Sequence, residues 1–178
     1  MEVAAIRPLG LETTGLSRPQ SLEDLAALRA PQLLELYRRA EVPTVPELDG
    51  DLRGRMLAVR GSGRVWFALL RAFAAWRHFP WRGKSFWSRT IATRGDGINR
   101  VFGDERPRRW FRFETCIGPS RADGGPAFQL DYDNPDNPFF IRVIADEVRQ
   151  VAPGLFLGQA YVTLFGKPRL ALYFALMR

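Results

Sequence analysis

The 178-residue sequence has little of the chemistry that small proteins use for cross-links and metal sites. Its single cysteine, Cys116, excludes an internal disulfide and a zinc site built from cysteines. Its single histidine, His78, excludes most metal sites and most nucleophile–base pairs that depend on imidazole. A chain of this length buries roughly 70% of its unfolded surface and needs no such support. We therefore expect no metal, no cofactor, and a fold held by its hydrophobic core.

Long hydrophobic runs are also missing. The longest apolar stretch begins at Val65, ends at Trp76 and is interrupted by Arg71. It is shorter than the roughly 20 apolar residues of a membrane-spanning helix. The first twenty residues lack the apolar core of a secretory signal. We expect a soluble cytoplasmic protein.

Basic residues outnumber acidic ones by 26 to 19, and only Lys84 and Lys167 are lysines. The excess lies in residues 51–112, which carry 15 basic and 4 acidic groups together with all five tryptophans. Phosphate contacts and base stacking are open to such a segment. However, its arginines are spread singly along the chain rather than clustered. We therefore expect a solvated basic surface and no nucleic-acid partner.

Helices are predicted near the N-terminus, after an irregular lead-in. Ser21 is placed to cap a first helix with Asp24 at its third position. Pro31 opens a second helix that ends at Arg39. The two prolines of residues 42–46 predict a stiff extended connector. We assign residues 1–46 to a lead-in and helices that pack on a barrel domain over residues 47–178.

From residue 50 onward, short runs of alternating apolar and polar residues are separated by Gly, Pro and Asp. This pattern is typical of antiparallel strands. Residues 94–97 predict a turn. Seven or eight such strands favour a small closed barrel, or a strongly curved sheet, and eight strands can enclose one small ligand. The predicted strands are 52–59, 84–93, 98–102, 108–117, 128–133, 155–165 and 170–177.

Two segments do not follow this alternation. Residues 64–79 predict a helix that is apolar nearly all round, so it is buried against the sheet, covers an opening, or lies on a membrane or partner. Asn137 and Pro138 begin a second segment with helical spacing. We predict a helix over its first half, whereas residues 146–151 fit either a helix or a strand.

Short motifs over residues 47–178 resemble the GXWXG-containing, uncharacterised lipocalin-like proteins of bacteria. Residues 50–54 (Gly-Asp-Leu-Arg-Gly) stand at the GXWXG position, with Leu52 in place of the tryptophan. Residues 81–86 (Trp-Arg-Gly-Lys-Ser-Phe) are similar to a W-x-G-K-x-F element of that family. The resemblance implies a calycin-type barrel and no known reaction. A related group binds haem through a histidine near the chain end, which this chain lacks. Further similar residues are 130–133, 157–158 and 173–176.

A barrel with this pattern would enclose a mostly apolar cavity. Tyr132 shares a strand face with apolar residues, so its hydroxyl needs a partner and could orient a ligand. The forked donors of Arg149 could receive a carboxylate or other anion at the barrel mouth, and Lys84 could serve similarly. The predicted ligand-binding residues are Tyr132, Arg149, Lys84, Phe111, Phe113, Phe128, Leu130, Leu172 and Phe174.

Other polar candidates have simpler structural interpretations. His78 could be a general base, but a histidine at a helix end also offsets the helix dipole. The aspartates of residues 131–136 could supply an acid and a base, yet such clusters usually form turns. Asp146, Glu147 and Arg149 are interpreted first as local ion pairs on a solvated face. Cys116 is expected to be a packing residue.

Three functions follow from these patterns. The first is binding of a small hydrophobic or amphipathic molecule in the barrel cavity. The second is a cofactor-free isomerase or cyclase acting in the same cavity, with no catalytic residue assigned. The third is a membrane-surface protein that docks through the apolar stretch from Val65 to Trp76. The oligomeric state stays open.

Overall fold

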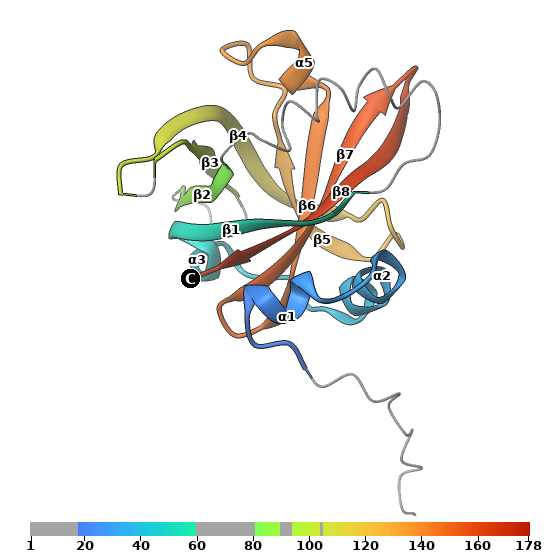
Figure 1. Cartoon of the computed structure of the whole chain (residues 1–178). Helices are drawn as coiled ribbons and strands as arrows, with labels where there is room; N and C mark the ends of the chain where they lie inside the picture. The colour runs from blue at the N-terminus through green and yellow to red at the C-terminus, as the bar shows by residue number, and fades with distance from the viewer. Residues whose placement is uncertain (1–17, 60–80, 90–93, 104) are drawn as a thin grey trace, which may run out of the picture.

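A computed structural model describes residues 18–59, 81–89, 94–103 and 105–178. Eight antiparallel strands pair in chain order, and the last pairs with the first, which closes a barrel (Figure 1). The prediction of a mainly β, antiparallel barrel is confirmed. The strands are β1 (Gly50–Val59), β2 (Trp81–Ser88), β3 (Arg94–Val101), β4 (Arg108–Pro119), β5 (Pro126–Asp131), β6 (Ile144–Ala152), β7 (Leu155–Leu164) and β8 (Lys167–Met177).

Two hydrophobic clusters lie on the two faces of this sheet because successive side chains of a strand point to opposite sides. One cluster lies inside the barrel and includes Phe113, Phe128 and Phe156. The other lies outside, where the N-terminal helices cover β6, β7, β8 and β1. The barrel is therefore packed on both faces along this arc, which explains why β6, β7 and β8 are buried over most of their length.

The two predicted N-terminal helices are present. In α1 (Leu22–Ala26), the Ser21 hydroxyl accepts a hydrogen bond from the Asp24 backbone N–H at 3.0 Å, which confirms the capping box. α2 (Ala30–Arg39) has Pro31 in its first turn, and Leu33 and Tyr37 are fully buried against the barrel.

The extended connector is only partly correct. Residues Val45–Leu48 form the short helix α3, with Pro46 in its first turn. Val45 and Leu48 belong to the interior cluster, so α3 closes one end of the barrel (Figure 1). This end is called the lower end below. The other, upper end carries the β7–β8 turn and α5 (Phe139–Arg142).

The prediction of a turn at residues 94–97 is wrong, because these residues begin β3. The glycine at position 97 serves close packing rather than chain reversal. A Cβ there would lie 2.2 Å from the Phe113 ring and 2.8 Å from the Ser85 carbonyl oxygen. Position 97 therefore requires glycine because no space is left for a side chain. The sequence pattern could not distinguish a glycine required for close packing from a glycine that forms a turn.

The second irregular segment divides into a helix and a strand. The predicted helix is limited to the four residues of α5, and residues 146–151 belong to β6. The predicted helix over residues 64–79 lies outside the described residues, as do His78 and the apolar stretch from Val65 to Trp76. Within the described part of the chain, no helix has both the length and the hydropathy to cross a membrane.

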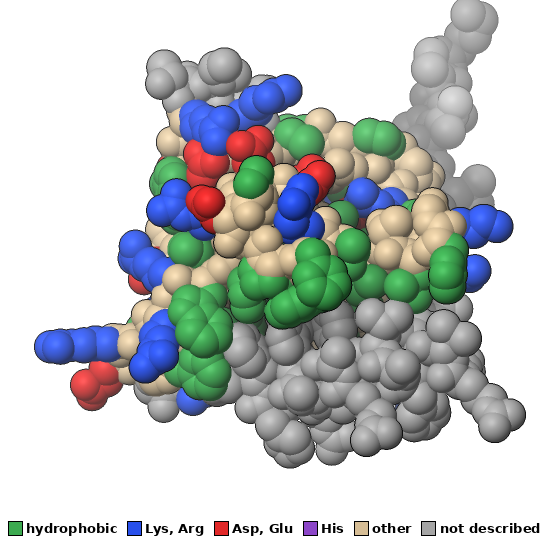
Figure 2. Space-filling model, turned by 90° about the horizontal axis from the view of Figure 1, so that it is seen from above, with side chains coloured by type: hydrophobic (Ala, Val, Ile, Leu, Met, Phe, Trp, Pro, Cys, Tyr) green, Lys and Arg blue, Asp and Glu red, His purple; other side chains and the backbone are tan. Residues whose placement is uncertain are grey.

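Exposed aromatic side chains gather around the upper end. Phe139 on α5 is 81% exposed and Phe165 in the β7–β8 turn is 94% exposed. Phe165 and Gly166 both have positive φ, 49° and 73°, as a two-residue type I′ turn requires. Figure 2 views this end and shows hydrophobic side chains in a band across it. Phe140 in α5 and Val143 directly after it are exposed as well.

Candidate functional site

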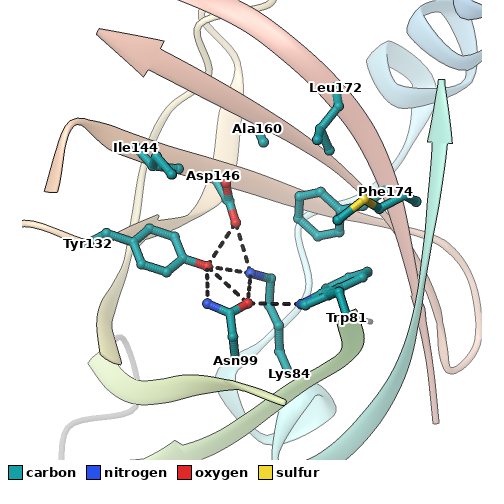
Figure 3. A pocket seen from close by; sticks show the side chains of 10 residues that line it. Trp81, Lys84, Asn99, Tyr132, Ile144, Asp146, Ala160, Leu172 and Phe174 are labelled. Atoms are coloured by element: carbon teal, nitrogen blue, oxygen red, sulfur yellow. Dashed lines mark hydrogen bonds and ion pairs between the residues drawn. The ribbon is translucent and has the colours of Figure 1, made fainter. Parts of the chain in front are cut away.

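The barrel interior is hollow toward its upper end. The cavity has a volume of about 30 Å³. This is room for about two water molecules. Six strands and Tyr132, which directly follows β5, contribute to its wall, which combines an apolar side with a polar side. The lining residues are Met56, Trp81, Lys84, Asn99, Tyr132, Ile144, Asp146, Ala160, Leu172 and Phe174 (Figure 3).

Lys84 of β2 brings a primary amine into this wall. The preceding Gly83 has φ 129°, and a Cβ there would lie 2.0 Å from the Leu52 carbonyl oxygen, so the glycine lets β1 and β2 pair closely. The Lys84 side chain is only 3% exposed. Its Nζ donates to Asp146 Oδ2 at 2.9 Å, to Asn99 Oδ1 at 2.9 Å and to the Tyr132 hydroxyl (Figure 3).

Tyr132 follows β5 and connects the amine to the carboxylate. Its hydroxyl donates to Asp146 Oδ2 at 3.1 Å and accepts from Asn99 Nδ2 at 3.0 Å. The Trp81 indole N–H donates to Asn99 Oδ1 at 3.0 Å, which fixes the orientation of the Asn99 amide. Trp81, Lys84, Asn99, Tyr132 and Asp146 form one hydrogen-bonded group, called the inner cluster below.

Donors and acceptors in the inner cluster do not balance. Asp146 Oδ2 accepts from two groups, whereas Asp146 Oδ1 is buried and has no hydrogen-bond partner among the described residues. Buried carboxylate oxygens nearly always have a donor. The cavity wall therefore presents an acceptor that a water or a guest molecule would satisfy.

Burial and neighbouring charges change the titration of this group. Burial lowers the pKa of the Lys84 amine, and the adjacent Asp146 carboxylate opposes part of that shift. Burial raises the pKa of the Tyr132 phenol well above its ordinary value, and Asp146 raises it further. Lys84 Nζ also lies 5.1 Å from the ring centroids of Tyr132, Phe113 and Phe174. The rings favour the ammonium form, whereas burial disfavours it.

The structure brings part of the predicted ligand-binding set together. Tyr132, Lys84, Leu172 and Phe174 line the cavity. Phe113, Phe128 and Leu130 belong to the packed interior cluster and are not among the lining residues; Phe113 and Phe128 each make edge contacts with Phe86. Half-buried Phe111 packs against the interior cluster, and its carbonyl oxygen accepts a hydrogen bond from Asn99 Nδ2. Strand alternation predicts which face of the sheet a side chain is on, but not how far along the barrel it lies. It therefore could not distinguish the residues that line the cavity from those of the packed interior.

The expectation for Arg149 is wrong. Its side chain is on the outer face of β6, where it pairs with Asp123 at 2.7 Å and donates to the backbone carbonyls of Pro126 and Tyr37. The interpretation of Asp146, Glu147 and Arg149 as ion pairs on a solvated face is also wrong, because all three are buried. Asp146 faces the cavity, whereas Glu147 and Arg149 face α2.

Glu147 is the centre of an outer cluster, which comprises Glu147, Tyr37, Ser120, Arg121, Asp123 and Arg149. Glu147 Oε1 accepts from the backbone N–H and the guanidinium of Arg121, at 2.7 and 3.0 Å. Glu147 Oε2 accepts from the hydroxyls of Ser120 and Tyr37, at 2.7 and 3.2 Å. Both oxygens are therefore satisfied, unlike those of Asp146.

The remaining candidates lie away from the cavity. Asp131 accepts a hydrogen bond from the Asp133 backbone N–H at 2.9 Å, and Asp133 pairs with Arg142, which agrees with the turn interpretation. Cys116 is a half-buried free thiol on β4. Sequence reasoning had no signal for Asn99 and named Trp81 only as part of the W-x-G-K-x-F element, because the partners of both side chains come from other strands. Within the described residues, no three His, Cys, Asp or Glu side chains could jointly hold a metal ion.

Comparisons with known proteins support the fold alone. No family model matches the chain, so its resemblance to the GXWXG-containing proteins stays a prediction. No curated protein matches it either. A crystal structure of a protein from Thermomonospora curvata is similar, with a TM-score of 0.51 and 21% identity over 85% of this chain and 88% of that one. At this identity the likeness establishes a shared barrel architecture.

Proposed function

We propose that the barrel binds a small amphipathic molecule in its upper cavity, with the polar end of the guest at the inner cluster. Asp146 Oδ1, which has no hydrogen-bond partner in the described part of the chain, carries this proposal. A guest with a hydroxyl or N–H group would donate to this oxygen, and its apolar part would contact Ile144, Leu172 and Phe174. A charge-assisted hydrogen bond of this kind stabilises a complex more than a neutral one.

The cost of burying Lys84 and Asp146 supports a binding role. A buried ion pair stabilises a fold little, because desolvation offsets most of its attraction. In the lower half of the barrel, an apolar interior with residues such as Phe86 and Phe128 provides the stability. The inner cluster thus adds polar groups where the fold does not require them, beside space that a guest can enter.

The size of the cavity limits the guest. Space for about two waters accommodates a few non-hydrogen atoms without rearrangement of the wall. This fits a small amphipathic molecule better than the larger hydrophobic ligands that lipocalin-like barrels can enclose. Exposed Phe139 and Phe165 at the upper end also favour approach of a partly apolar molecule.

The test compares propan-1-ol with methoxyethane, an ether of the same size that has no donor. Binding is followed by the NMR shift of the Trp81 indole N–H, since this group lines the cavity. We expect the alcohol to bind about tenfold more tightly than the ether. Ala160→Leu, which fills the cavity, should abolish the shift, and Asp146→Asn should weaken alcohol binding.

Glu147→Gln is the matched control, because it alters the adjacent buried carboxylate on the opposite face of β6. It should leave alcohol affinity unchanged. Equal affinity for alcohol and ether, or a shift that persists in Ala160→Leu, would contradict the proposal.

A cofactor-free isomerase or cyclase is the second candidate. The hydrogen bonds that join Lys84, Tyr132 and Asp146 favour it, because together they offer a proton donor and a proton acceptor in one cavity. This candidate requires turnover of a bound substrate that is lost in Asp146→Asn and retained in Glu147→Gln.

A further inference from the structure

We propose that Lys84 forms a reversible imine with a small aldehyde or ketone bound in the upper cavity. This inference rests on the proposed function only in that it uses the same cavity, and it adds small carbonyl compounds, which accept hydrogen bonds rather than donate them, as a second class of guest. It goes beyond binding because it assigns a covalent step to the Lys84 amine, which lines the cavity and is 3% exposed.

The neighbours of Lys84 are those that imine formation needs. The attacking amine must be neutral, and Asp146 Oδ2 lies 2.9 Å from Nζ, where it can take the proton. Tyr132 keeps its proton because burial raises its pKa, so its hydroxyl can donate to the carbonyl oxygen. The apolar wall of Leu172 and Phe174 would hold the rest of the guest and exclude water.

The step balances without any oxidant or reductant. Asp146 takes one proton from the Lys84 ammonium, and the nitrogen lone pair forms a C–N bond as the C=O π bond breaks. The oxygen receives a proton from Tyr132, which regains it from Asp146, and the nitrogen gives its second proton to Asp146, so a neutral carbinolamine forms. Asp146 passes this proton to the carbinolamine hydroxyl, which leaves as water while the nitrogen lone pair forms the C=N bond. The products are the protonated imine, which keeps the third N–H proton, and one water, and hydrolysis reverses the step.

The identity of the basic residue supports this reading. Of 26 basic residues, Lys84 and Lys167 are the only lysines, so arginine fills the other 24 basic positions. A guanidinium stays protonated and cannot act as the nucleophile, whereas a desolvated lysine amine can. Position 84 in the barrel wall therefore carries lysine, the type of basic side chain that can react with a carbonyl group.

The Lys84–Asp146 pair controls the pH dependence of the step. Among the described residues that line the cavity with Lys84, only Asp146 on β6 and Tyr132 after β5 titrate. Burial lowers the pKa of Lys84, so its neutral form persists at lower pH than that of an exposed lysine. The other described neighbours, none of which titrates, are Met56, Trp81, Asn99, Ile144, Ala160, Leu172 and Phe174.

Lys167 provides an internal control for the experiment, because it is exposed at the start of β8. The full-length protein is incubated with acetaldehyde and cyanoborohydride. Cyanoborohydride reduces the imine, which leaves a stable ethyl group on the lysine nitrogen. Peptide mass spectrometry then follows ethylation at each lysine. At about pH 6 we expect ethylation of Lys84 to be about tenfold faster than that of Lys167.

Variants separate a cavity reaction from general amine reactivity. Ala160→Leu should abolish ethylation of Lys84 and leave that of Lys167 unchanged. Asp146→Asn should slow the reaction at Lys84 and shift its pH profile, whereas Glu147→Gln should do neither. Ethylation of Lys84 that is as slow as that of Lys167, or that is unaffected in Ala160→Leu, would overturn the imine.

The alcohol experiment distinguishes this failure from failure of the proposed function. If propan-1-ol binds in the cavity but Lys84 stays unmodified, the imine is overturned and the binding proposal stands. If Lys84 is modified but alcohol and ether bind equally, the imine is supported and the donor requirement is overturned. If neither result is obtained, both proposals fail.

Discussion

Two adjacent residues of β6 place carboxylates on opposite faces of the barrel, and their surroundings differ. On the outer face, Glu147 accepts four hydrogen bonds that satisfy both of its oxygens. On the inner face, Asp146 has two donors on Oδ2 and none, among the described residues, on Oδ1. A complete set of bonds is typical of a structural cluster, whereas an incomplete set beside a cavity is typical of a binding site.

The elements that each cluster joins also distinguish a structural cluster from a binding site. The outer cluster joins α2 to the β4–β5 hairpin, through Tyr37 on one side and Ser120 and Arg121 on the other. It thus fixes a helix on the barrel wall. The inner cluster joins strands that are already paired within a closed sheet. Its bonds are not needed to hold these elements together, so its polar groups remain available to a guest.

The largest effect should come from breaking the inner ion pair. Lys84→Met leaves the Asp146 carboxylate buried without its cation, and we expect the free energy of unfolding to fall by about 3–5 kcal/mol. The double variant Lys84→Met/Asp146→Leu removes both charges and should come within about 1 kcal/mol of the original protein. Urea unfolding measures both values. A double variant as unstable as the single one would give the inner cluster a structural role.

The outer cluster should respond differently to the same treatment. Glu147→Leu should cost about 2–4 kcal/mol, because the hydroxyls of Tyr37 and Ser120 and the Arg121 backbone N–H lose their acceptor. Adding Arg121→Met should not recover this loss, since those three donors still lack a partner. Urea unfolding of the single and double variants tests this. Recovery in the double variant would remove the distinction between the clusters.

Local patterns were enough to predict the barrel but not the contents of its interior. Alternation identified the strands, and Ser21 with Asp24 marked the first helix start, because both signals depend on neighbours within a few residues. Alternation also put Tyr132 on the interior face. The height of a side chain along the barrel depends on strand register, so Phe128 and Tyr132 looked equivalent although only Tyr132 reaches the cavity.

The charged residues of β6 show the limit more sharply. In sequence, Asp146, Glu147 and Arg149 resemble a solvated patch, because three ionisable groups close together usually face water. Their burial depends on distant partners: Lys84 lies 62 residues from Asp146, and Tyr37 lies 110 residues from Glu147. Pairing over such separations leaves no periodic trace in one sequence. Only the W-x-G-K-x-F motif drew attention to Lys84 beforehand.

The smallest expected effect concerns the edge of the outer cluster and its dependence on pH. The hydrogen bond from Arg149 lowers the pKa of the Asp123 carboxyl below its ordinary 3.8. The folded state therefore binds this proton less readily than the unfolded chain does. The stabilisation is fully present above pH 3.8 and is lost as the pH falls through the folded-state pKa. Because the Asp123 side chain is 23% exposed and water screens part of its attraction to Arg149, we expect less than about 1 kcal/mol.

Asp123→Asn tests this expectation. Urea unfolding should find the variant slightly less stable than the original protein at neutral pH, and the difference should vanish near about pH 2. The matched inner variant, Lys84→Met/Asp146→Leu, leaves the Arg149–Asp123 pair intact. Like the original protein, it should lose the stabilisation from Asp123 as the pH falls. A difference that is constant across the pH range would mean that Asp123 acts through its backbone turn, where its Oδ1 accepts from the Gly125 N–H, rather than through its charge.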